Sequence, residues 1–345
     1  MRHLIRWEAA LALLLVVEIA VFGLINPRFL NLSGLLFGTA DFVQIGMVAV
    51  PLTLVIIAGG IDVSFGSIIG LTAIAFGLVL HFGGPLWLAV GASLALGAAA
   101  GMLNATIIRL TRLQPLVVTL GALYLYSGAA TVLAGAAGAG GYEGIGGFPA
   151  GFTALGYRQV LGMPLSLLVF LGLSALMIVL LHATRLGRAM FLIGQSEDAA
   201  RHSGLPVHRV QALTHVILGV FAAIAGLMMS AYFGSARTDL GATTLLPAVT
   251  AAVLGGASIY GGTGSVLGTV LATFLIGYLQ QGLQMAGVPS QISSALSGAL
   301  LVIVVAIRFG SQTLRAGVPG WPRPGARRAR PVPDNTNPQP VEENS

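Results

Sequence analysis

The sequence predicts an all-α protein that crosses a membrane about ten times and keeps both termini in the cytoplasm. Three observations support this prediction. The chain of 345 residues is 56% hydrophobic and only 8% charged, and its mean hydropathy is +0.90. Apolar runs long enough to cross about 30 Å of hydrocarbon recur along it. The arginines cluster between alternate runs, as the preference for positive charge on the cytoplasmic side requires.

The apolar runs predict the spans in order. The first run, within 1–25, follows two arginines as a signal peptide would, but it is long, contains Glu18 and lacks a small-residue cleavage site. We therefore predict a first transmembrane helix there. The other predicted spans are 42–58, 65–82, 86–108, 116–135, 161–181, 211–232, 245–260, 265–285 and 291–307. The span at 245–260 is the shortest and contains Pro247 and two glycines, which predicts a broken helix.

Arginine positions fix the orientation. With the N-terminus inside, every arginine except Arg28, Arg158 and Arg237 falls on the cytoplasmic side. An even number of spans then returns the Arg-rich C-terminus to the cytoplasm. We expect a membrane domain over 1–310 and a disordered Pro/Arg-rich cytoplasmic tail over 311–345, either solvated or touching anionic lipid.

Two parts of the chain resemble each other. PLTLVIIAGG at 51–60 and PAVTAAVLGG at 247–256 share a proline and a glycine pair, and GSIIG at 66–70 and GSVLG at 264–268 follow them. The predicted topology gives both copies the same orientation. An internal repeat would suit a transporter, whereas Gly-rich membrane turns can also look alike by chance, and the sequence leaves both interpretations open.

The segment 182–210 concentrates charge between two apolar runs. Within it, Ser196 can cap a short helix whose first turn carries Glu197 and Asp198. Gly204 can close that helix and Pro206 prevents its continuation. Such a helix is either an ordinary loop element or a rigid knob that another protein can push.

Composition excludes several functions. The chain has no cysteine, so it forms no disulfide. It has no lysine, so it cannot itself carry a phosphate-binding ATPase loop. The arginines lie at span ends and in the tail, which argues against nucleic-acid binding. We find no metal-ligand or catalytic motif and expect no enzyme and no cofactor bound to this chain.

Polar residues inside the predicted spans are candidates for a transport pathway. They are uncharged groups in the last two spans, suited to a hydroxylated solute or to hydrogen bonds between helices: Gln280, Gln281, Gln284, Ser290, Ser294 and Ser297. Glu18 lies within a span, where carboxylates are costly and often functional. Asp41 and Asp62 lie near span ends, where we expect solvation, and Asp62 is expected to shape a turn.

The external segments carry three charged residues that can dock another protein or be ordinary loop residues: Glu143, Arg237 and Asp239.

Four separated motifs resemble the permeases of ribose-type ABC importers, in order from about residue 5 to 310. They are GGIDVSFGSIIGL at 59–71, PLVVTLGALYLYSG at 115–128, GRAMFLIGQSEDAARHSGLPVHRV at 187–210 and VLGGASIYGGTGSVLGT at 253–269. The resemblance implies a multi-pass protein of the inner membrane that works with a cytoplasmic ATPase pair, which binds ATP and Mg, a second permease and a periplasmic solute-binding protein. It also implies that one loop couples to the ATPase, through Gly187, Arg188, Gly194, Ser196, Glu197, Asp198, Ala199, Ala200, Arg201 and Gly204.

A closer resemblance is to the D-type permeases that import autoinducer-2, a small sugar-like signal. GYEGIGGFP at 141–149, YFGSARTDLGA at 232–242 and the segment 278–301 carry it. It implies autoinducer-2 as cargo and a relative, not a copy, as the second permease. Ribose, rhamnose or another sugar is the alternative cargo. A proton-driven secondary transporter using Glu18 or Asp62, and a passive channel, are the alternative mechanisms.

Overall fold

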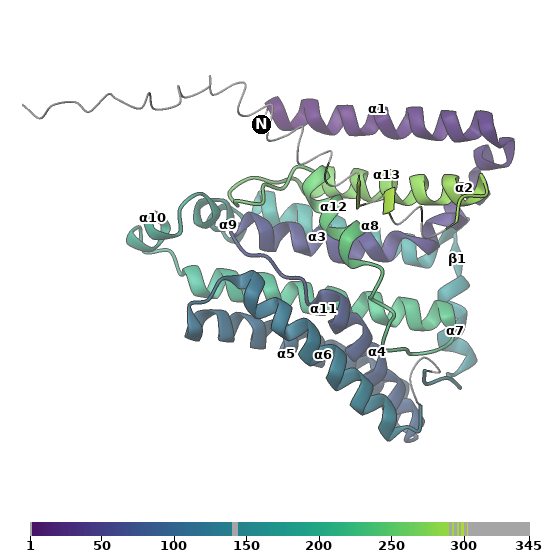
Figure 1. The fold of residues 1–345 in the computed structure, drawn as a ribbon, viewed down its shortest axis with the longest axis horizontal. Helices are drawn as coiled ribbons and strands as arrows, with labels where there is room; N and C mark the ends of the chain where they lie inside the picture. The colour runs from purple at the N-terminus through teal and green to yellow at the C-terminus, as the bar shows by residue number, and fades with distance from the viewer. Residues whose placement is uncertain are drawn as a thin grey trace, which may run out of the picture. The chain divides into compact units, whose positions relative to one another are not determined.

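The computed structural model describes residues 2–139 and 144–289, together with scattered positions between 292 and 302. In these residues nearly all regular structure is helical (Figure 1), and the one sheet is a hairpin of two-residue strands, β1 (Gln159–Val160) and β2 (Met163–Pro164). The long helices are α1 (Arg2–Ile25), α3 (Val43–Ile57), α4 (Phe65–His81), α5 (Leu86–Thr111), α6 (Pro115–Ala136), α8 (Leu165–Ala183), α11 (Val207–Phe233) and α13 (Val266–Met285). The short ones are η1 (Pro27–Leu30), α2 (Leu32–Gly38), η2 (Thr39–Asp41), α7 (Ala150–Tyr157), α9 (Arg185–Gln195), α10 (Glu197–His202) and α12 (Leu245–Leu254).

The prediction of an all-α polytopic membrane protein is confirmed. In the described part of the chain, six helices are long and apolar enough to cross a membrane, or seven if the pair α2–α3, bent by 61°, forms one span. Two further predicted spans are shorter helices, α4 with 17 residues and α12 with 10. Each predicted span before residue 290 thus contains a helix, while 291–307 and the tail lie outside the region described continuously.

Loop contacts define two ends of the bundle. At one end Gly262 N donates to Ile57 O at 3.0 Å, and a Cβ on Gly194 would lie 1.9 Å from the same carbonyl oxygen. Trp7 joins this end through a 2.8 Å bond from its indole N–H to Leu254 O. At the other end Ile145 pairs with Ala236 in an antiparallel bridge. The first end contains 182–210 and the start of α1, as the predicted orientation requires.

Small residues let the central helices approach closely. A Cβ on Gly97 would lie 2.4 Å from Gly219 O, and one on Gly101 would lie 2.2 Å from His215 O. These glycines, four residues apart, place α5 directly against α11. Helix α3 packs at the centre, and all of its 15 residues are buried.

The two similar sequence segments form similar structures. In each, a helix (α3 or α12) ends before a glycine pair and a turn leads into the next helix (α4 or α13). Both turns lie at the same end, where Gly262 bonds to Ile57, and Thr53 and Thr269 hydrogen bond at 2.8 Å between α3 and α13. The copies therefore have the same orientation.

An irregular segment, 234–244, runs along α4 before α12 begins. The Cβ of Ala236 lies 3.0 Å from a Cβ built on Gly77, Thr238 O lies 2.2 Å from one on Gly70, and Gly241 O lies 2.9 Å from one on Gly66. Eleven residues of helix separate Gly66 from Gly77, about 16 Å of rise. The segment thus descends beside α4, and α12 completes the passage as a half-length helix.

Candidate functional site

Helices α9 and α10 carry the charged segment 182–210 and lie at the same end of the bundle as the start of α1, the end predicted to be cytoplasmic (Figure 1). The Ser196 hydroxyl accepts a 3.3 Å bond from Ala199 N and so caps α10, as predicted. Gly204 adopts φ +77°, and Leu205 N donates to Ala200 O at 3.1 Å, which ends the helix. The predicted start and end of this helix are confirmed.

Helix α9 was not predicted. Thr184 caps it by accepting a bond from Gly187 N at 3.2 Å. Met190 and Ile193 are buried while Arg185 and Arg188 are exposed, so the helix is amphipathic. The signal was available in the sequence as Thr184 followed by an apolar face at helical spacing, but the high charge of the segment concealed it.

The residues predicted to couple to an ATPase divide into two groups. Exposed positions, available to a partner, are Arg188, Ser196, Glu197, Asp198, Ala199, Arg201 and Gly204. Positions that serve packing are Gly187, Gly194 and Ala200. A Cβ on Gly187 would lie 1.9 Å from Leu181 O, and Ala200 is 4% exposed. The packing residues hold α9 and α10 against the bundle, so that the exposed residues face outward.

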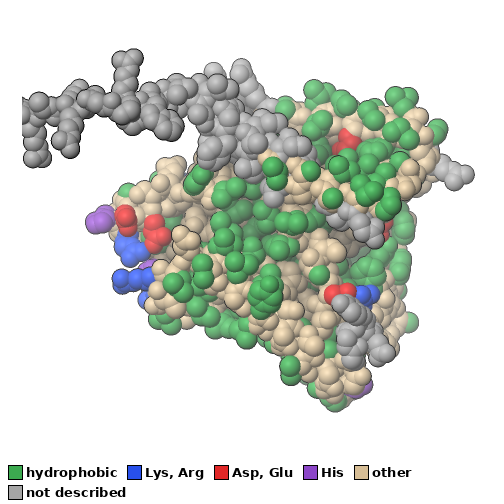
Figure 2. All heavy atoms as spheres, viewed as in Figure 1, with side chains coloured by type: hydrophobic (Ala, Val, Ile, Leu, Met, Phe, Trp, Pro, Cys, Tyr) green, Lys and Arg blue, Asp and Glu red, His purple; other side chains and the backbone are tan. Residues whose placement is uncertain are grey.

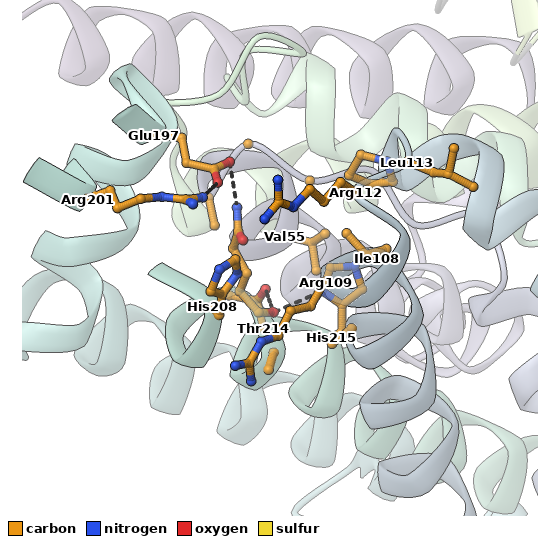
Figure 3. A pocket seen from close by; sticks show the side chains of 17 residues that line it. Val55, Ile108, Arg109, Arg112, Leu113, Glu197, Arg201, His208, Thr214 and His215 are labelled. Atoms are coloured by element: carbon orange, nitrogen blue, oxygen red, sulfur yellow. Dashed lines mark hydrogen bonds and ion pairs between the residues drawn. The ribbon is translucent and has the colours of Figure 1, made fainter. Parts of the chain in front are cut away.

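A cavity of about 490 Å³ opens beside this helix pair. Figure 3 shows Arg112, directly after α5, facing Glu197 and Arg201 of α10 across it, and Arg109, in the last turn of α5, also lines the cavity. Arg201 pairs with Glu197 at 2.6 Å. Because both side chains are about half exposed, this pair contributes little stability. The cavity connects the surface of α10 to the deeper His215.

A buried polar network lies next to His215. The Asp62 carboxylate accepts bonds from Ser64 N at 2.8 Å and Ser64 Oγ at 2.7 Å, and from Asn104 Nδ2 at 3.1 Å. Tyr126 OH donates to Asn104 Oδ1 at 2.8 Å. His215 Nε2 lies 3.9 Å from Asp62 Oδ2. Asp62 shapes the turn as predicted, but its expected solvation is wrong, because the residue is 1% exposed and satisfied by protein groups.

A second cavity, of about 510 Å³, lies between α4, α6 and the descending segment. Its polar lining comprises Ser67, Ser127, Thr131, Thr238 and Asp239, and Leu245 at the start of α12 also lines it. Sequence reasoning did not find this site. Its residues come from three separate segments, and only the descent of 234–244 brings them together.

The three glutamines predicted as pathway candidates lie on α13, away from both cavities. Gln281 packs against α2, where its Nε2 lies 2.0 Å from a Cβ built on Gly38. Gln280 is half-buried and Gln284 is exposed, and none of the three lines either cavity described above. Ser290, Ser294 and Ser297 lie outside the described residues.

Glu18 lies on α1, and both of its carboxylate oxygens are buried. No described residue hydrogen bonds to either oxygen.

The external candidates form an ion pair. Arg237 donates to Asp239 through Nε at 2.9 Å and Nη2 at 2.6 Å, and both side chains are about one-third exposed. Figure 2 shows one such neighbouring acidic and basic pair among mostly hydrophobic and neutral side chains, away from the charged side chains that gather at the end of the molecule carrying α9 and α10. The pair belongs to the descending segment, and Asp239 lines the second cavity. Glu143 lies outside the described residues.

Within the described ranges no group of three His, Asp or Glu side chains lies close enough to hold a metal ion. The apolar helices, with one cavity beside α10 and one between α4 and α6, are those of a polytopic membrane protein of the permease class.

Comparison with known proteins identifies the family. The family described as the branched-chain amino acid transport system/permease component matches residues 34–305, and the chain belongs to it. The chain is 57% identical over 301 residues to the autoinducer 2 import system permease protein LsrD of Enterobacter sp. (strain 638), covering 87% of this chain and 92% of the relative. It is 56% identical over 299 residues to the protein of the same name in Escherichia coli (strain K12), covering 87% and 91%. Among solved structures, PsaBC from Streptococcus pneumoniae in complex with Fab aligns with a TM-score of 0.47 at 17% identity, covering 83% of this chain and 95% of that one.

Proposed function

We propose that this protein is one permease subunit of an ATP-driven importer that carries autoinducer-2, or a closely similar sugar-like solute, across the inner membrane. The 57% identity to an autoinducer 2 import permease, over 87% of the chain, is the observation that carries the proposal. The similarity covers the external segments, the descending segment and the helix pair α9–α10 together.

In this proposal the energy comes from a separate ATPase, because the chain has no lysine for a phosphate loop. The exposed face of α10 is where we place the ATPase contact. Gly194, at the end of α9, lies against Ile57 and Gly262, so a displacement of the helix pair acts directly on the turns after α3 and α12. Partner binding would then bias a membrane core with two arrangements.

A second permease and a periplasmic binding protein complete the proposed assembly. The binding protein would dock at the end that carries α7 and the hairpin, opposite to α10. These partners are expected because the relatives are named as permeases of an import system and because the chain resembles the permeases of ribose-type ABC importers.

The test is uptake in cells that lack their own autoinducer-2 permeases and express this chain with a matching ATPase, second permease and binding protein. We expect uptake of labelled autoinducer-2 that stops when ATP is depleted and survives an uncoupler while ATP stays high. Uptake that follows the proton gradient instead would favour a secondary transporter. Strong competition by ribose or rhamnose would replace the narrow cargo with a broader sugar specificity.

A further inference from the structure

The cavity between α4, α6 and the segment 234–244 is lined by several side-chain hydroxyl groups. Four of its lining side chains are hydroxyls: Ser67, Ser127, Thr131 and Thr238. Its volume of about 510 Å³ lies within the range of roughly 300–1,000 Å³ typical of small-molecule sites. We call it the hydroxyl cavity.

Irregular backbone makes this cavity possible. Segment 234–244 descends about 16 Å beside α4, and its backbone lies against Gly66 and Gly70. Non-helical backbone at such depth is tolerated where it is buried in protein or lines a water-filled space. Here one side of the segment contacts α4 and the other, through Thr238 and Asp239, lines the hydroxyl cavity.

The lining has hydrogen-bonding capacity to spare. Within the described part of the chain, the side-chain hydroxyls of Ser67, Ser127 and Thr238 make no recorded hydrogen bond to another protein group. The Thr131 hydroxyl donates to Ser127 O at 3.0 Å and keeps its acceptor capacity. Groups of this kind can donate to and accept from a solute.

Charge in the cavity is balanced. Among the described lining residues Asp239 is the one that is charged, and Arg237 pairs with that carboxylate through two short bonds. A solute with a net charge would therefore find no unpaired opposite charge among these residues, whereas a neutral solute with several hydroxyls would find several partners.

Helix α6 separates this polar site from the apolar surface. Leu123, Ser127 and Thr131 lie at i, i+4 and i+8 on one face and line the cavity. Leu125, two residues before Ser127 and so on the other side of the helix, does not line it and is 56% exposed. In a membrane-spanning helix a polar face is stable only against water or protein, so the face of α6 that carries Ser127 requires one of these beside it, whereas Leu125 can face lipid or a neighbouring subunit.

We propose that the hydroxyl cavity holds the solute during its passage and that the ligand is a small, uncharged, polyhydroxylated molecule. This inference rests on the proposed function and assigns its solute-binding residues. Helix α12 links the cavity to the proposed ATPase contact, because it begins at Leu245 in the cavity wall and leads to the turn in which Gly262 lies against Gln195, the last residue of α9.

The chain contains no cysteine, so no native cysteine has to be removed first. A single introduced cysteine therefore reports the accessibility of its own position. In the assembled importer we expect Ser127→Cys and Thr131→Cys to react with a small hydrophilic thiol reagent, while Leu125→Cys, on the opposite face of α6, does not. Autoinducer-2 supplied with its binding protein should slow labelling of Ser127→Cys several-fold. Equal reactivity of the Ser127 and Leu125 variants, or no protection during active uptake, would overturn the assignment.

Transport kinetics give a second readout. Loss of one hydroxyl contact in Ser127→Val should raise the KM for uptake, or lower its maximal rate, about three- to tenfold, while Ser127→Thr keeps most activity. Thr106→Val, which removes an exposed hydroxyl on α5, is the control. Wild-type kinetics in Ser127→Val would contradict the proposal. Failure of the unmodified importer to take up autoinducer-2 would instead refute the proposed cargo. Cysteine labelling of the Ser127 and Leu125 variants without solute would still test whether the hydroxyl cavity is accessible to water.

Discussion

Individual glycines decide how closely the central helices approach. Gly101 faces His215 O at a distance that no side chain can occupy, 2.2 Å from the position of a Cβ. Gly91, on the same helix, has nothing within 4 Å of that position. The two residues look alike in the sequence and differ only through the contact between α5 and α11.

Gly101→Ala is therefore expected to destabilise the protein by about 1–3 kcal/mol, because its methyl group forces α5 away from α11. Gly91→Ala, the matched control, should be neutral or stabilise by up to about 1 kcal/mol, since alanine is the better helix former. Thermal unfolding of the two variants in the same detergent measures the difference. Equal melting temperatures would mean that the α5–α11 contact is not as close as described.

Asp62 is a second residue whose role depends on its neighbours. Asp62→Ala leaves the two donors of Ser64 and one amide hydrogen of Asn104, whose other bond goes to Ser64 Oγ, without the carboxylate as acceptor. We expect a loss of about 1–3 kcal/mol together with reduced uptake. Asp62→Asn keeps an acceptor for Ser64 and should be milder in both assays. This pair also tests proton coupling, because an asparagine carries no exchangeable carboxyl proton. Complete loss of uptake in well-folded Asp62→Asn would favour the secondary transporter.

At the scale of elements, α10 is a short helix that is mostly exposed and packs against the bundle through the buried Ala200. Ala200 is buried and Gly204 has a positive φ, so substitutions there change the helix itself. Ala199 is exposed on its outer surface. Replacing Glu197, Ala200 and Gly204 together would abolish uptake but would mix these effects, whereas Ala199 isolates the contact.

Ala199→Glu is expected to abolish ATP-driven uptake and reduce co-purification of the ATPase, while the permease stays folded in the membrane. The added carboxylate occupies the outer surface of α10 without disturbing its cap. Ala154→Glu, the same change at an exposed alanine of α7 on the opposite end, should leave the ATPase bound. Normal ATPase binding and uptake in Ala199→Glu would exclude α10 as the coupling element.

Elements that depend on neighbouring residues in the sequence could be predicted, whereas features that depend on contacts between distant segments could not. Ser196, Gly204 and Pro206 were sufficient to place α10, because capping depends on neighbouring residues. The hydroxyl cavity could not be predicted, since Ser67, Ser127 and Thr238 meet only through the descent of 234–244. The glutamines of α13 share a helix face, as predicted, but that face packs partly against α2 at Gly38. Periodicity identifies a face and does not say what covers it.

At the scale of the whole molecule, the charged helix pair and the hairpin mark opposite ends of the bundle. Arginine positions predict which end is cytoplasmic, and loop contacts place α9, the turn at Gly262 and the start of α1 together at that end. The orientation is what assigns ATP-driven coupling to one end and capture of solute to the other.

The absence of native cysteine makes this orientation directly measurable. Gln159→Cys, exposed in the hairpin, should react with a membrane-impermeant maleimide applied to spheroplasts, because the hairpin faces the periplasm in the inner-membrane orientation proposed. Ala199→Cys should react only after the membrane is permeabilised. Labelling of the unmodified chain, which should be nil, sets the background. The reverse labelling pattern would mean that the protein has the opposite orientation in the membrane and that α10 cannot contact a cytoplasmic ATPase. This measurement therefore comes before any interpretation of the coupling variants.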